Sequence, residues 1–103
     1  MRLIYHPHAE VELIKAAQFY ERRVAALGAQ FLDAADSAIG VIQSAPERWS
    51  VIEEDVRRYL MPRFPYAVYY RVLADHIRIL AIKHNSRHPD YWRHRLTDQN
   101  TKT

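Results

Sequence analysis

Four residues in the second half of the chain carry side chains that could together cleave RNA without a metal ion. They are Arg63, His84, Arg87 and Tyr91, and each lies at or just beyond the end of a predicted strand. Such a reaction needs one group to activate the 2′-hydroxyl, one to stabilise the phosphorane and one to protonate the leaving oxygen. The same residues also fit a surface of solvated arginines with a tyrosine that only packs. The residue types alone leave both interpretations open.

Basic side chains surround these four positions. Residues 56–103 carry ten Lys or Arg and three Asp or Glu, a net charge of +7. Residues 1–55 carry five Lys or Arg and nine Asp or Glu, a net charge of −4. Twelve of the basic residues are arginines, which form forked contacts with phosphate and carboxylate and stack on rings. Such a basic half favours a nucleic-acid target or an acidic protein partner. The candidate target-binding residues are Arg57, Arg58, Arg71, Lys83, Arg93 and Arg95.

Metal and cofactor chemistry is not predicted. His84 and His88 are four residues apart, but Pro89 places them in a loop, and only Asp90 stands near as a further ligand. The chain has no cysteine, so thiolate sites are excluded. No phosphate-binding glycine loop and no hydrolase nucleophile motif is present. We therefore expect no metal and no cofactor.

The elements that must position these residues follow from the spacing of apolar side chains. Residues 2–5 are short and β-prone and precede Pro7, which predicts a strand leading into a helix. Apolar residues then recur at spacings of three and four, with Gly28 as the predicted end of this helix. Residues 29–44 form a second apolar face. Two helices joined near one glycine predict a helical hairpin.

The second half of the chain predicts a sheet. Residues 47–55 are expected to be a polar connection anchored by Trp49, and they precede three runs rich in β-branched and aromatic residues, at 56–63, 66–73 and 77–83. The predicted fold is α+β with the order β-α-α-β-β-β, in which the hairpin packs on one face of an antiparallel sheet and the other face stays partly open. Residues 1–96 form the expected domain, and residues 97–103 a short polar tail.

Three bulky apolar residues of the first helix fall outside its core-facing stripe. They are Val11, Ile14 and Phe19. Scattered exposed apolar side chains are common on protein surfaces, so these residues predict either ordinary surface or a binding face for a partner protein.

The whole chain of 103 residues has the size of one domain. No apolar run approaches the length that spans a membrane, so we expect a soluble, cytoplasmic protein without membrane contact.

The order and spacing of several short motifs resemble the RelE/ParE toxin superfamily, which includes plasmid stabilisation proteins. The resemblance covers about residues 2–96 and includes Pro7-x-Ala9-x-x-x-Leu13, the helical hairpin, and the segments RRYLMPRFPYAVYYRV and IRILAIKHNSRHPDYW. Members of this superfamily resemble small RNases in fold. They are the toxins of bacterial type II toxin–antitoxin modules. The resemblance therefore implies a toxin that arrests bacterial growth and is neutralised by a cognate antitoxin.

Two activities are consistent with this resemblance. The RelE-like branch is a metal-independent endoribonuclease that cuts mRNA on the ribosome, whereas the ParE-like branch poisons DNA gyrase. In the RelE-like branch, Arg63 matches the arginine that contacts the scissile phosphate, Arg87 the arginine after the last strand, and Tyr91 the C-terminal tyrosine; His84 could supply a general acid or base. The lysines typical of that branch are reduced here to Lys83. The alternative is a non-toxic nucleic-acid-binding module or a degenerate toxin homologue. An antitoxin would occupy Val11, Ile14 and Phe19.

Overall fold

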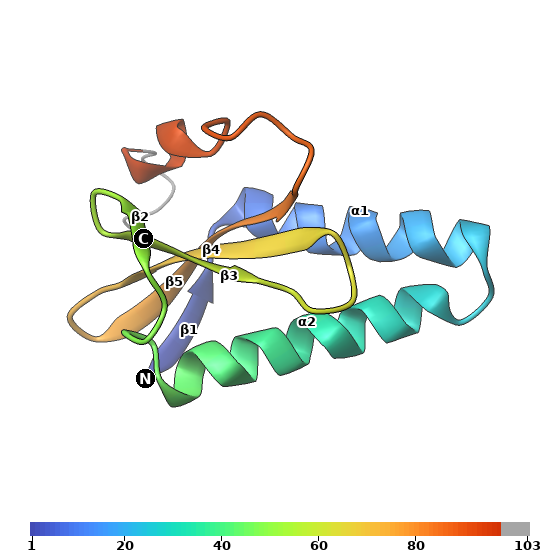
Figure 1. Cartoon of the computed structure of the whole chain (residues 1–103), viewed down its shortest axis with the longest axis horizontal. Helices are drawn as coiled ribbons and strands as arrows, with labels where there is room; N and C mark the ends of the chain where they lie inside the picture. Colours follow the sequence, from blue (N-terminus) through green and yellow to red (C-terminus); the bar gives the residue numbers. More distant parts are fainter. Residues whose placement is uncertain (98–103) are drawn as a thin grey trace.

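The computed structural model describes residues 1–97 and consists of a helical hairpin packed on a five-stranded sheet (Figure 1). The predicted α+β class is confirmed. The elements follow in the order β1 (Arg2–Tyr5), α1 (Pro7–Arg23), α2 (Leu27–Ser44), β2 (Val51–Glu53), β3 (Val56–Leu60), β4 (Tyr66–Val72), β5 (His76–His84) and the 3-10 helix η1 (Arg93–Leu96). Most of the expected polar tail, residues 98–103, lies outside the described residues.

The sheet differs from the prediction in two respects. Its strand order is β1-β5-β4-β3-β2, and β1 pairs with β5 in parallel, so the sheet is mixed rather than antiparallel. The hairpin and three further strands separate β1 from β5, and this long connection brings the two strands together in the same direction. The second difference is β2, which lies inside the segment expected to be a polar connection. It has three residues at the sheet edge, too few to show a periodic pattern.

The first helix ends earlier than the apolar spacing predicts. It begins at Pro7 after His6, whose ring accepts a hydrogen bond from the amide of His8, and it ends at Arg23. Gly28 is therefore not its stop but lies in the first turn of α2. A Cβ at Gly28 would lie 2.5 Å from the Ala17 carbonyl oxygen, so glycine is required there because the two helices approach closely.

The carboxylate of Glu21 completes the turn between the two helices. It accepts the amide hydrogens of Ala26 and Gly28, both at 2.9 Å, and so satisfies donors at the start of α2 that have no partner within the helix. Ala26 itself has a φ of 71°, the left-handed conformation that reverses the chain. The turn therefore depends on a side chain from the preceding helix, which helix periodicity does not reveal.

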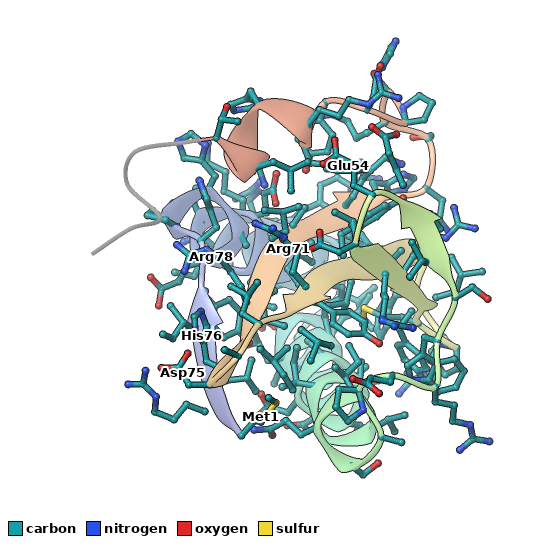
Figure 2. The ribbon with its side chains drawn as sticks, turned by 90° about the vertical axis from the view of Figure 1, so that its left-hand side faces the viewer. Met1, Glu54, Arg71, Asp75, His76 and Arg78 are labelled. Atoms are coloured by element: carbon teal, nitrogen blue, oxygen red, sulfur yellow. The ribbon has the colours of Figure 1, made fainter. Side chains whose placement is uncertain are left out.

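Both faces of the sheet carry a buried cluster. The hairpin covers one face, where Ala9 of α1 and Phe31 of α2 share a buried cluster with Tyr70 of β4 and Ile79 of β5. On the other face, the segment after β5 places the ring of Trp92, 1% exposed, against Tyr69, Val56 and Leu80. This segment lies on the side of the sheet away from α2 in both views (Figures 1 and 2). Trp92 therefore anchors the chain that follows β5, and this anchoring positions Arg87 and Tyr91.

No helix in residues 1–97 combines the length and the apolar composition needed to cross a membrane.

Candidate functional site

A hollow of about 210 Å³ lies between α1 and the carboxyl end of β5. We call it the α1–β5 pocket, and its lining residues are Glu12, Lys15, Ala16, Phe19, Tyr66, Ile82, His84, Arg87 and Tyr91. Three of the four candidate catalytic residues, His84, Arg87 and Tyr91, thus line one pocket. The fourth, Arg63, does not.

His84 ends β5 and presents one ring nitrogen to the chain that follows it. Its Nδ1 accepts the backbone amide hydrogen of Ser86 at 3.0 Å and lies 2.8 Å from the Ser86 hydroxyl. Because Nδ1 accepts a hydrogen bond from an amide, the proton of the neutral ring lies on Nε2. The ring also packs edge-on against Tyr66, with 5.0 Å between the ring centroids. His84 is therefore held in one orientation, with Nε2 available as a donor.

Tyr91 is fixed by a partly buried polar cluster that connects α1, β5 and η1. Its hydroxyl donates a hydrogen bond to Oε2 of Glu12. Burial and this bond to the carboxylate raise the pKa of Tyr91 far above its ordinary value of 10.0, while Arg95 and Arg87 act in the opposite direction. At neutral pH, Tyr91 is therefore a neutral phenol whose proton is already engaged.

Glu12 is the centre of this cluster. Its two carboxylate oxygens accept hydrogen bonds from the two terminal nitrogens of Arg95, at 3.0 and 2.8 Å. Oε1 also accepts a hydrogen bond from the backbone amide of Ile82 at 3.0 Å. Arg95 has a side chain only 5% exposed and donates a further bond to the Leu80 carbonyl at 3.0 Å. We call Glu12, Arg95 and Tyr91 the Glu12 clamp. It attaches the end of the described chain to the first helix.

The remaining charges of the pocket are basic and exposed. Arg87 places its guanidinium carbon 4.8 Å from the centroid of the Tyr91 ring, a cation–π contact. Lys15 projects from the exposed side of α1 and lines the same pocket. The charge of Glu12 is balanced by Arg95. Among residues 1–97, the α1–β5 pocket therefore presents two positive charges without an ion-pair partner, which attract an anionic group.

The side chain of Arg63 bonds to α2 and lines another hollow, although the turn that carries it leads into Tyr66, which pairs with His84. Arg63 follows β3 and donates a hydrogen bond to Oε1 of Gln30 on α2 at 3.0 Å. It lines a separate hollow of about 440 Å³, formed mainly by α2 together with Tyr59 and Pro62. No residue of this hollow also lines the α1–β5 pocket.

Two candidate target-binding arginines of the sheet are engaged within the protein. Arg57 donates to the carbonyl oxygens of Glu47 and Trp49, at 3.0 and 2.6 Å. Arg71 forms a forked ion pair with Asp55, with distances of 2.9 and 3.0 Å. Figure 2 labels Arg71 on β4, with Asp75 and His76 at the turn into β5 and Arg78 beyond it.

The other four target-binding candidates are equally dispersed. Arg93 pairs with Glu53 and Asp90, and Arg95 is buried in the Glu12 clamp. Lys83 is buried and donates to the His84 carbonyl at 3.1 Å. Arg58 lines a third hollow beside β2. The structure thus brings none of the six residues into the α1–β5 pocket.

The antitoxin-binding candidates are exposed. The exposed fractions of Val11, Ile14 and Phe19 are 46%, 49% and 41%. Phe19 also forms a wall of the α1–β5 pocket, so this face of α1 and the pocket are continuous.

Sequence reasoning missed Glu12, Lys15 and Tyr66 as residues of the pocket. A signal for Glu12 was present, because it stands three and four residues from the buried Ala9 and Ala16 and therefore borders the packed side of α1. A carboxylate at such a position requires a partner. No group of three or more His, Asp or Glu side chains within residues 1–97 is arranged to hold a metal ion.

Comparison with known proteins gives the family. The model of the ParE toxin of the type II toxin–antitoxin system parDE matches residues 3–89. Among solved structures, a chain described as the chromosomal ParDE TA system from P. aeruginosa superposes with a TM-score of 0.72 and 19% identity, covering 82% of this chain and 95% of that one. At this identity the likeness establishes the fold. No curated protein matches significantly. Because the family model spans most of the sequence, the chain belongs to the ParE toxin family of type II toxin–antitoxin systems.

Proposed function

We propose that this type II toxin arrests growth by inhibiting DNA gyrase, through a protein–protein contact centred on the α1–β5 pocket, and that it is not a ribonuclease. The observation that carries the proposal is the placement of the Arg63 side chain, which bonds to Gln30 of α2 and lines a different hollow from His84, Arg87 and Tyr91. Cleavage of RNA requires charge stabilisation and proton transfer at one phosphate. Here the arginine that would contact that phosphate lies in another hollow.

The state of Tyr91 also supports the proposal. A tyrosine that activates a 2′-hydroxyl must accept a proton, yet the hydroxyl of Tyr91 donates to Glu12 and its pKa is strongly raised. The phenolate is therefore not accessible at neutral pH. Of the three candidates that line the pocket, His84 and Arg87 retain groups that can act on a bound molecule.

The surface charges point in the same direction. Ion pairs engage Arg71 and Arg93, and Arg95 is buried. Binding to a nucleic-acid backbone depends on several unpaired cations along one track. Lys15 and Arg87, which form no ion pair within residues 1–97, instead line the pocket together with the exposed ring of Phe19, a combination typical of protein interfaces. A gyrase inhibitor acts in the cytoplasm, in agreement with the predicted location.

The ribonuclease remains the second candidate, because His84, Arg87 and Tyr91 share one pocket. Two assays with the purified chain separate the candidates. One measures supercoiling of relaxed plasmid by gyrase, and the other measures cleavage of mRNA on translating ribosomes. We expect loss of supercoiling with intact mRNA. Arg87→Ala should relieve the inhibition, whereas Arg48→Ala, an exposed arginine beyond α2, should not. Codon-dependent mRNA cleavage with normal supercoiling would refute the proposal, and inactivity in both assays would indicate a degenerate homologue.

A further inference from the structure

Four residues of α1 form a row in which apolar and basic side chains alternate. They are Val11, Lys15, Phe19 and Arg23, at a constant spacing of four, so each is a neighbour of the next and the row winds gradually around the helix. Val11 and Phe19 are exposed, and the Arg23 guanidinium carbon lies 4.6 Å from the centroid of the Phe19 ring. We call these residues the α1 row. Lys15 and Phe19 belong to the α1–β5 pocket as well, so the row leads into the pocket.

The basic side chains and the imidazole that the pocket can offer to a bound molecule act as donors. Lys15 supplies an ammonium, Arg87 a guanidinium, and His84 its Nε2 hydrogen. The carboxylate oxygens of Glu12 are already occupied by Arg95, Tyr91 and the amide of Ile82. A carboxylate that entered the pocket would therefore meet two positive charges and no unbalanced negative one.

The size of the pocket restricts what can enter. Its volume of about 210 Å³ is below the usual range for drug-sized ligands, which begins at roughly 300 Å³. One side chain of a partner protein fits a space of this size. The apolar members of the α1 row also favour a protein partner over a nucleic acid, because a phosphate backbone gains nothing from covering Val11 and Phe19.

We propose that the antitoxin lays an acidic amphipathic segment along the α1 row and inserts one carboxylate into the α1–β5 pocket, between Lys15 and Arg87. Apolar residues of that segment cover Val11 and Phe19, and its acidic residues face Lys15 and Arg23. The inserted carboxylate covers Arg87 and His84, so the antitoxin and the target compete for one surface. This competition rests on the proposed function, whereas the docking geometry does not.

Charge-reversal variants of the intact chain test the docking geometry. Titration calorimetry measures the affinity for the antitoxin encoded by the adjacent reading frame, with Lys15→Glu and Arg87→Glu as test variants. Both residues are exposed, and we expect each change to weaken binding by about tenfold to a hundredfold, because a paired charge becomes a repulsion. The matched control is Arg48→Glu, the same charge change beyond the end of α2, which should alter affinity less than threefold.

A reciprocal change identifies the inserted carboxylate. Single Glu→Lys and Asp→Lys variants of the antitoxin are combined with Lys15→Glu, and one of them should restore affinity. Circular dichroism verifies that each variant is folded, and Lys15→Ala provides a milder form of the same test. Unchanged affinity in folded Lys15→Glu and Arg87→Glu proteins would overturn the proposal, as would an equal loss in Arg48→Glu.

Small probes test the pocket without the antitoxin. Amide resonances of residues 82–91 are followed by NMR during addition of 3-phenylpropionate, its uncharged analogue 3-phenylpropanol, and inorganic phosphate. We expect the carboxylate to shift these resonances, the alcohol to leave them unchanged, and Arg87→Glu to abolish the response. Tighter binding of phosphate than of the carboxylate would overturn the proposal in favour of a nucleic acid.

The gyrase assay separates this inference from the proposed function. Charge-dependent antitoxin binding without gyrase inhibition refutes the proposed function and leaves the docking geometry supported. Gyrase inhibition, together with an antitoxin affinity that is unchanged in Lys15→Glu and Arg87→Glu, refutes the docking geometry alone.

Discussion

Removal of the carboxylate of Glu12 should be among the most destabilising single changes that the structure predicts. In Glu12→Ala, Arg95, with a side chain 5% exposed, keeps its charge but retains only the bond to the Leu80 carbonyl and the contact with the Tyr91 ring. The Ile82 amide and the Tyr91 hydroxyl lose their acceptor in the same step. Breaking a buried ion pair from one side costs about 3–5 kcal/mol. This is a large share of the roughly 5–15 kcal/mol that stabilises a domain.

The partner variant should cost less. In Arg95→Met, Glu12 keeps the Ile82 and Tyr91 donors, and its side chain is 20% exposed and can be hydrated, so we expect a loss of about 1–3 kcal/mol. In the double variant no unpaired guanidinium remains. Its loss should therefore fall short of the sum of the single losses by at least about 1 kcal/mol.

Urea unfolding measures these free energies, with far-ultraviolet circular dichroism for the helices and with tryptophan fluorescence in a Trp49→Phe background for Trp92. Because Trp92 is buried beside Tyr69, its emission reports whether the segment after β5 detaches before the rest unfolds. A Glu12→Ala loss below about 0.5 kcal/mol, or additive single losses, would refute the clamp. The matched control is Glu10→Ala, an exposed carboxylate in the same helix that should change stability by less than about 0.5 kcal/mol.

Three further predictions follow from packing and charge. Gly28→Ala should destabilise the protein by about 1–3 kcal/mol in the same unfolding assay, because the added Cβ would lie 2.5 Å from a backbone oxygen of α1; an unchanged midpoint would contradict that approach. Folding raises the pKa of Tyr91 above its ordinary 10.0, so its contribution to stability is complete below pH 10 and is lost at higher pH. Between pH 8 and 11, the free energy of unfolding should therefore decline less steeply with pH in Tyr91→Phe than in the wild type, and equal slopes would contradict this. Finally, replacing the exposed Val11 and Ile14 by Asp should weaken the antitoxin complex in calorimetry, because each lost apolar anchor contributes roughly 1.5–3 kcal/mol; full affinity would place the antitoxin elsewhere.

The pocket was only partly predictable from the residue pattern. Three of its residues, His84, Arg87 and Tyr91, could be grouped from the sequence because they stand within a few residues of each other at the end of one strand. All three line the pocket in the structure, in agreement with that grouping. Arg63 stands at the end of another strand, and its sequence motif does not specify which hollow its long side chain enters. Glu12 was missed because its partner Arg95 is 83 residues away, a separation that no local period encodes.

The sequence by itself determined the two helices, the three long strands, the family and the exposed positions of Val11, Ile14 and Phe19. These features are local, because the periods of apolar residues and the turn-forming residues show which face of each element is buried. Only the tertiary structure decided the parallel pairing of β1 with β5, the short edge strand β2, the close helix approach at Gly28 and the Glu12 clamp. Each of these depends on contacts between distant segments, and the free energy of such contacts is realised only when the whole chain has packed.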